Sequence, residues 1–148
     1  FSAQEMFEKV QEFYYSSDIA IASAAVADYR PKTVASQKLK KSDEDLSITL
    51  ERTTDILKWM GEHKENQILV GFALETENEE ENAKKKLVKK NLDFIVLNSL
   101  NDKGAGFKGK TNKVSLINHK FEVKAFELKN KAEVAQDIFN EINIIKNG

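Results

Sequence analysis

The chain has 148 residues, a length that suits one domain built around a single hydrophobic core. It has no cysteine, which excludes a disulfide framework, a thiol nucleophile and a cysteine-based zinc site. Its formal net charge of −1 gives no indication of a nucleic-acid-binding protein. No apolar run approaches the roughly 18 residues of a membrane span, and no signal-peptide pattern opens the chain, so we expect a cytoplasmic protein with no membrane contact.

Helical and strand-like patterns alternate along the chain. Ser2 followed by Glu5 is a capping-box pattern, and the apolar spacing after it predicts a helix over 2–15. Continuous apolar runs predict buried strands at 18–24, 67–74 and 93–98. Periodic patterns predict further helices at 53–64, capped by Thr53 or Thr54, at 76–91 and at 131–146. The remaining predictions are an extended segment at 46–51, a glycine-rich loop at 101–110, and late strands at 113–118 and 121–128 around a turn.

Strands that alternate with helices are typical of an α/β domain with a mostly parallel sheet. Ligands of such sheets bind beyond the carboxyl ends of the strands, which directs attention to Asp28, to the turn "GFALET" and to the segment after 98. Such folds usually open on a strand and a glycine-rich turn, whereas this chain opens on a predicted helix. We therefore expect a domain, residues 1–148, that lacks its N-terminal glycine-rich βα unit.

A carboxylate and several lysines follow the first predicted strand. Asp28 precedes an extended stretch that carries Lys38, Lys40 and Lys41, and small residues at 22–25 would let a flat ligand approach the backbone. Carboxylate oxygen suits Mg²⁺, and ammonium groups offset the charge that builds on phosphate oxygens. The alternative interpretation is an aspartate in a turn followed by a solvated lysine loop.

The lysine-rich end of the helix at 76–91 also has two interpretations. Lys86 and Lys90 lie four residues apart and share one helical face, from which they could reach a phosphate. Lysines at a helix C-terminus also compensate the helix dipole without any ligand. A nucleic-acid surface is not indicated, because no aromatic residues are interleaved with the lysines and the first half of the helix is acidic.

Several motifs in order along the chain resemble the phosphopantothenate–cysteine ligase family. The motifs are "SAAVADYRPK", "KLKK" ten residues after the aspartate, "TDIL", "VGFALET", "KKKLVKKNLDFIVLN", and "GAGF" followed by "TNKVSLI". The resemblance implies a Rossmann-like, three-layer fold with an extended lysine-bearing flap. It also implies a reaction that joins 4'-phosphopantothenate to cysteine with CTP, through an acyl-cytidylate intermediate, in coenzyme A biosynthesis.

The resemblance implies roles for particular residues. Lys38, on the flap, is the expected catalytic residue that neutralises charge as the acyl-cytidylate forms. Asp28 is expected to bind Mg²⁺ and the triphosphate. The other expected nucleotide-contacting residues are Ala22, Ser23, Ala24, Thr54, Asp55, Ile56, Leu57, Phe72, Lys86 and Lys90.

The resemblance also implies partners. We expect a homodimer whose flap helps to cover a site at the subunit interface, and a flavin-dependent decarboxylase domain fused to or associated with the ligase. "VLNSL" stands where the family has "AND", and no role is assigned to Asn98. The alternative hypothesis is a Rossmann-like nucleotide-binding or interaction module that performs no chemistry.

Overall fold

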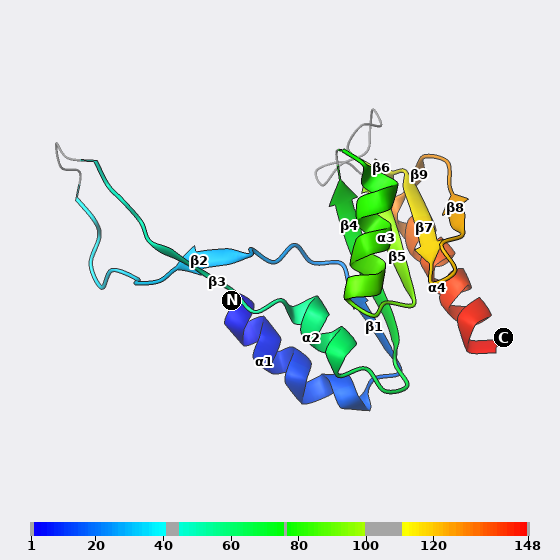
Figure 1. Ribbon diagram of the computed structural model, residues 1–148, viewed down its shortest axis with the longest axis horizontal. Helices are drawn as coiled ribbons and strands as arrows, with labels where there is room; N and C mark the ends of the chain where they lie inside the picture. Colours follow the sequence, from blue (N-terminus) through cyan, green and yellow to red (C-terminus); the bar gives the residue numbers. More distant parts are fainter. Residues whose placement is uncertain (1, 41–44, 76, 100–110, 148) are drawn as a thin grey trace.

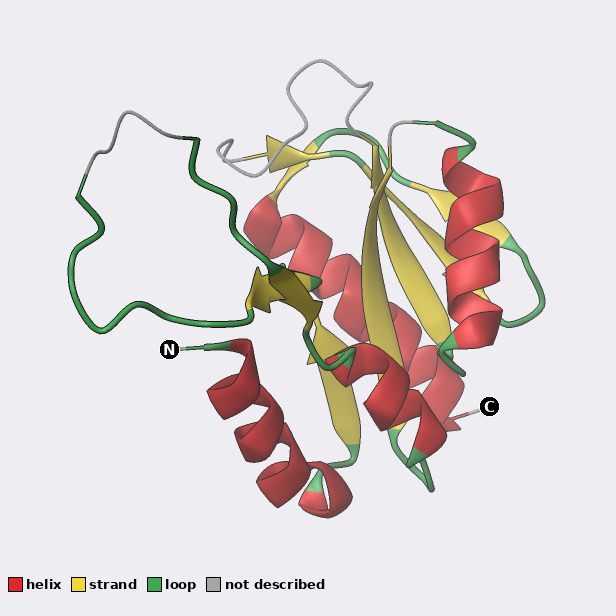
Figure 2. Ribbon diagram, turned by 60° about the vertical axis from the view of Figure 1, so that its left-hand side comes forward, coloured by secondary structure: helices red, strands yellow, loops and turns green. Residues whose placement is uncertain are grey.

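A central β-sheet lies between two layers of helices. The computed structural model describes residues 2–40, 45–75, 77–99 and 111–147. Figures 1 and 2 show the sheet with α1, α2 and α3 towards one face and α4 on the other. The elements in chain order are α1 (Ala3–Phe13), the 3₁₀ turn η1 (Tyr14–Ser16), β1 (Ile19–Ala22), β2 (Tyr29–Pro31), β3 (Leu50–Arg52), α2 (Ile56–Glu62), β4 (Ile68–Glu75), α3 (Glu79–Lys89), β5 (Phe94–Ser99), β6 (Thr111–Asn112), β7 (Val114–Asn118), β8 (Val123–Ala125), β9 (Lys129–Asn130) and α4 (Lys131–Asn147).

The strands of the main sheet follow the order β1-β4-β5-β7-β8. The β1–β4 and β4–β5 pairs are parallel, whereas β7 is antiparallel to both β5 and β8. Four strands therefore run in one direction and only β7 opposes them. The sheet is mostly parallel, as the sequence predicted, and the carboxyl ends of β1, β4 and β5 meet at one edge.

Two hydrophobic clusters bury the two faces of the sheet. On one face, side chains of α2 and α3 pack on alternate residues of the strands, such as Leu69, Ile95 and Leu97. On the other face, Val134, Ile138 and Ile142 of α4 pack on the intervening strand residues. The strand sequences are continuous apolar runs because helices cover both faces of the sheet.

The flap leaves this body as a two-stranded ribbon. β2 and β3 pair antiparallel, with Tyr29 opposite Arg52, and Arg30 forms an ion pair with Glu51 at 2.8 Å. The described residues between them, 32–40 and 45–49, extend away from the sheet and helices, as Figure 1 shows. The described residues of this excursion are exposed, including the apolar Val34, of which 84% is accessible. The extended flap predicted from the sequence is therefore present.

Most predicted elements are found, with shifts at their ends. Ser2 caps α1 in a capping box with Glu5, as predicted. The helix predicted at 53–64 is shorter, and its N-cap is Asp55 rather than Thr53 or Thr54, because the Asp55 side chain accepts a hydrogen bond from the Lys58 amide. The predicted loop at 101–110 lies outside the described residues. Among the residues that the structure places, no helix has the length and apolar character needed to cross a membrane.

Candidate functional site

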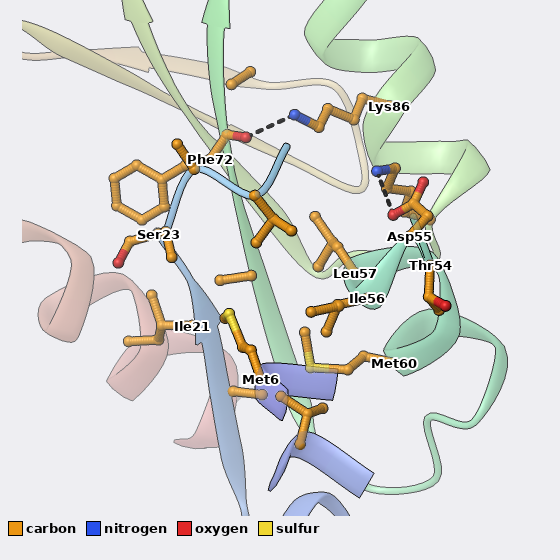
Figure 3. Close-up of a pocket in the computed structure, with 18 of the residues that line it drawn as sticks. Met6, Ile21, Ser23, Thr54, Asp55, Ile56, Leu57, Met60, Phe72 and Lys86 are labelled. Atoms are coloured by element: carbon orange, nitrogen blue, oxygen red, sulfur yellow. Dashed lines mark hydrogen bonds and ion pairs between the residues drawn. The ribbon is translucent and has the colours of Figure 1, made fainter. Parts of the chain in front are cut away.

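A cavity of about 960 Å³ opens at the edge of the sheet where β1, β4 and β5 end. This volume lies at the upper end of the range for small-molecule sites. Apolar side chains of α1, β1 and α2, such as Met6, Ile21 and Met60, line one end of it, and charged and polar groups line the other (Figure 3). The predicted site residues that line the cavity are Ala22, Ser23, Ala24, Asp28, Thr54, Asp55, Ile56, Leu57, Phe72, Lys86 and Lys90.

Asp55 connects two helices at the charged end of the cavity. Its carboxylate caps α2 by accepting a hydrogen bond from the Lys58 amide at 3.0 Å, and it accepts another from Lys90 Nζ at 2.9 Å. Burial raises the pKa of the Asp55 carboxyl, but the hydrogen bonds from Lys90 and Lys58 and the charges of Lys90 and Lys86 outweigh burial, so the net pKa is lowered. Asp55 therefore stays ionised and holds Lys90 at the rim.

A close backbone contact makes this pairing possible. A Cβ atom at Gly61 of α2 would lie 1.9 Å from the carbonyl oxygen of Lys90, so only glycine lets the two segments approach this closely. Asn91, in the left-handed conformation with φ of 50°, ends α3 and donates a side-chain hydrogen bond to the Gly61 carbonyl at 3.0 Å. The end of α3 is thereby fixed against α2, with Lys90 facing Asp55.

Lys86 lies one helical turn before Lys90 on the same face of α3. Its ammonium donates a hydrogen bond to the Phe72 carbonyl of β4 at 2.8 Å (Figure 3). Burial lowers the pKa of Lys86, as does the charge of Lys90, while the carboxylates of Glu75, Asp55 and Asp28 act in the opposite direction. Two lysines with carboxylates around them form a site where an anion can replace carboxylate and backbone partners.

The segment between β1 and β2 forms another wall of the cavity. The Asp28 carbonyl accepts a hydrogen bond from the Thr53 amide at 2.9 Å, and the Thr53 hydroxyl donates to the Ala27 carbonyl. The first strand, predicted at 18–24, ends at Ala22, and Asp28 directly precedes β2 rather than following β1. Asp28 still lines the cavity, because these contacts hold the segment across the sheet edge.

Lys38 is the one predicted site residue that does not line this cavity. It lies on the exposed flap, and no part of the described chain buries it. A single chain therefore does not bring Lys38 together with Asp28, Lys86 and Lys90. The prediction that Lys38 acts at the site consequently requires a second chain or a movement of the flap.

Two asparagines that line the cavity were not assigned from the sequence. Asn98 ends the buried run of β5 and Asn112 precedes β7, and both side chains reach the same cavity. The only signal in the sequence was a polar residue at the end of an apolar strand, "FIVLN". Nothing in the sequence indicated that Asn112 would join it.

The fold and the cavity together define a Rossmann-like α/β domain with a cavity at the carboxyl edge of its sheet that is lined by Asp28, Lys86 and Lys90. The sequence model of the DNA/pantothenate metabolism flavoprotein C-terminal domain family matches residues 1–145. The chain belongs to this family, and the resemblance inferred from the motifs is confirmed.

The similar proteins are much longer than this chain. The chain is 47% identical over 141 residues to the coenzyme A biosynthesis bifunctional protein CoaBC of Bacillus subtilis, covering 95% of the chain and 35% of that protein. It is 49% identical over 142 residues to a cysteine/cysteine sulfinic acid decarboxylase of an unknown prokaryotic organism, of which it covers 40%. The chain thus spans well under half the length of these relatives.

A solved structure supports the fold. The crystal structure of the C-terminal domain of a coenzyme A biosynthesis bifunctional protein CoaBC is 42% identical, with a TM-score of 0.78. The match covers 99% of this chain and 65% of that one. The three-layer, Rossmann-like architecture expected from the motifs is therefore confirmed.

Proposed function

We propose that this domain is the phosphopantothenate–cysteine ligase part of a coenzyme A biosynthesis protein. The observation that carries the proposal is the cavity at the carboxyl edge of the sheet, where Lys86, Lys90 and Asp28 come together. Membership of the pantothenate flavoprotein family and 47% identity to a CoaBC protein support the same function. The proposed reaction joins the carboxylate of 4'-phosphopantothenate to the amine of cysteine and consumes CTP.

In the proposed mechanism, the cavity binds the nucleotide with its phosphates at the charged end. Lys86 and Lys90 exchange their present partners, the Phe72 carbonyl and the Asp55 carboxylate, for phosphate oxygens. Ammonium groups fixed on a helix that is packed against the sheet stabilise the charge that develops as pyrophosphate leaves. The segment 22–24 and the start of α2 give the nucleotide backbone and apolar contacts.

Asp28 is the proposed ligand of Mg²⁺. No cluster of three or more metal-ligating side chains is found in the part of the chain that the structure describes. Mg²⁺ is commonly held by one or two carboxylates together with phosphate oxygens, and a single exposed carboxylate beside two lysines fits that pattern. Bound there, Mg²⁺ would neutralise phosphate charge, while Asp28 orients the triphosphate toward Lys86.

The flap is proposed to act across a homodimer interface. Its described residues are exposed and carry apolar side chains, among them Val34, which is 84% exposed, and Leu39, which is 60% exposed. A flap laid over the cavity of a second copy would bury these side chains and bring Lys38 to the phosphates. Closing the site in this way excludes water from the acyl-cytidylate.

We also propose that the domain works fused to, or associated with, a flavin-dependent decarboxylase. The relatives named as bifunctional, and the one named as a decarboxylase, are more than twice as long as this chain. A decarboxylase that follows the ligase reaction would use its product directly.

The test uses the full-length protein that contains this chain. Mixed with phosphopantothenate, cysteine, CTP and Mg²⁺, it should release pyrophosphate and form the amide product. Titrations of CTP and ATP in parallel would identify the preferred nucleotide. Binding of nucleotide with no pyrophosphate release under any of these conditions would favour the alternative, a nucleotide-binding module without catalysis.

A further inference from the structure

Two amide oxygens that border the cavity accept no hydrogen bond from the described residues. Asn98 is only 8% exposed, and neither its Oδ1 nor the Oδ1 of Asn112 accepts a hydrogen bond from any residue that the structure describes. Both residues line the cavity. Buried acceptors are nearly always satisfied, and leaving one unsatisfied is costly, so these two atoms call for a donor from a ligand.

The strand pairing and the chain connection place the two asparagines at the same end of β7. Asn98 pairs with Val114 across β5 and β7, and Val114 belongs to the cluster that packs against α4. Asn112 is the last residue of β6, which pairs with β9 and is separated from β7 by Lys113 alone. The chain therefore brings Asn112 to the end of β7 at which Asn98 lies, and both residues line the same cavity, so one small group bound there can contact both side chains.

This face of the cavity differs from the side that carries the α3 lysines. Lys86 and Lys90 approach from α3, which packs on the opposite face of the sheet. The N-terminal end of α4, with Lys131, also lines the cavity on the asparagine side. That side therefore combines two neutral acceptors with positive potential from a lysine and a helix N-terminus.

We propose that Asn98 and Asn112 bind the amine of the amino-acid substrate, an inference that rests on the proposed ligase function. A primary amine has two N–H donors, which match two acceptors, whereas a secondary amide has only one. Neutral oxygens do not stabilise the ammonium form as a carboxylate would, and the positive end of α4 disfavours it further. The amine is therefore held with its lone pair available.

The proposed step forms one C–N bond and breaks one C–O bond. The nitrogen lone pair forms the new C–N bond with the acyl carbon of the acyl-cytidylate. The bond between that carbon and the phosphate oxygen breaks, CMP leaves with the electron pair, and the nitrogen releases one proton to water. Asn98 and Asn112 are positioning residues in this step, because they orient the amine and exchange no proton with it.

The test separates the two half-reactions in the full-length protein. Asn98→Ala and Asn112→Ala should each raise the KM for cysteine about tenfold, the loss expected for one hydrogen bond. Pyrophosphate release from CTP and phosphopantothenate alone, in a single turnover, should be unchanged and reports that the variants are folded. Asn140→Ala, which removes an exposed asparagine of α4 that is bonded to Gln136, is the matched control.

The variant Asn98→Asp tests whether the acceptor at this position must be uncharged. Asn98→Asp should stabilise the ammonium form and move the pH profile of amide formation about one to two units toward alkaline pH, which a merely structural role would not do. An unchanged KM for cysteine in both alanine variants would overturn the inference. A rise in the KM for phosphopantothenate or CTP instead would assign the asparagines to another substrate and overturn it too. Absence of pyrophosphate release from the wild-type protein would overturn the proposed function itself.

Discussion

Asp55 Oδ1 accepts a hydrogen bond from Lys90 Nζ at 2.9 Å and so joins the start of α2 to the end of α3, across 35 residues of sequence. The same carboxylate caps α2. One side chain thus determines both the stability of a short helix and the position of a cavity lysine.

These two roles of Asp55 can be separated by substitution. Asn is as good an N-cap as Asp, so Asp55→Asn keeps the cap and removes the charge, while Asp55→Ala removes both. We expect Asp55→Ala to lower the free energy of unfolding by about 0.5–2 kcal/mol, and Asp55→Asn to lower it less. Urea unfolding of the two variants measures the difference. Equal losses would show that the ion pair, rather than the cap, stabilises α2.

Gly61→Ala tests the close contact between α2 and α3, because helix propensity and the contact predict changes in stability of opposite sign. On helix propensity alone, Gly61→Ala would stabilise α2 by up to about 1 kcal/mol. The Cβ atom would instead meet the Lys90 carbonyl at 1.9 Å, so we expect a loss of stability. Overpacking typically costs about 1–3 kcal/mol, and thermal unfolding would measure it. A stabilised variant would mean that the Lys90 carbonyl leaves room for a Cβ atom at position 61.

The pKa of Lys86 predicts how nucleotide binding depends on pH. Because burial lowers this pKa below its ordinary value of 10.5, Lys86 loses its proton at a lower pH than a solvated lysine does. Phosphate binds the protonated form, so CTP affinity should fall as pH rises toward 10.5, with uptake of a proton on binding. Calorimetry in buffers of different ionisation enthalpy detects this uptake. In Lys86→Gln the uptake should disappear, and its persistence would assign it to another group.

The lowered pKa of Lys86 also affects how the free energy of unfolding depends on pH. The unfolded chain holds the Lys86 proton more tightly than the folded chain does. Between the lowered folded pKa and 10.5, the contribution of Lys86 to the free energy of unfolding therefore rises with pH.

Lys38 can be tested by complementation between two inactive variants of the full-length protein. If the flap covers the cavity of a partner chain, a mixed dimer of Lys38→Gln and Lys86→Gln contains one site with both lysines intact. Mixing the two proteins, with time for subunit exchange, should then restore pyrophosphate release. If Lys38 acts on its own chain, every site in the mixture lacks one lysine and no activity returns. Lys38→Gln alone should reduce the rate about 10²–10³-fold, the usual effect of losing one charge contact at a transition state.

The sequence predicted the local elements much better than the contacts between them. Apolar runs located β1, β4 and β5, and the shared helical face of Lys86 and Lys90 was readable from their spacing. The Asp55–Lys90 pair was not, because it depends on how closely Gly61 lets α2 approach α3. Contacts of this kind depend on packing between elements that are distant in sequence, which local patterns do not encode.

The site was predicted mainly through the family motifs. Composition alone left Asp28 and the lysines as a possible solvated loop, and the motifs selected the residues that now line the cavity. Asn98 and Asn112 were missed because their proximity depends on the pairing of β5 with β7 and of β6 with β9, which the sequence did not specify. Lys38 was selected by the motifs too, but it lies on the exposed flap, away from the cavity of its own chain.

The proposed function depends most on binding of the nucleotide phosphates by the cavity lysines. The direct measurement is calorimetric titration of CTP into the full-length protein and into two double variants with equal net charge. Lys86→Gln with Lys90→Gln removes the lysines of the cavity, while Lys85→Gln with Lys89→Gln removes two exposed lysines of the same helix. We predict that the first pair weakens CTP binding about 100-fold or more and that the second leaves it nearly unchanged. Equal affinities of the two double variants for CTP would contradict phosphate binding by Lys86 and Lys90.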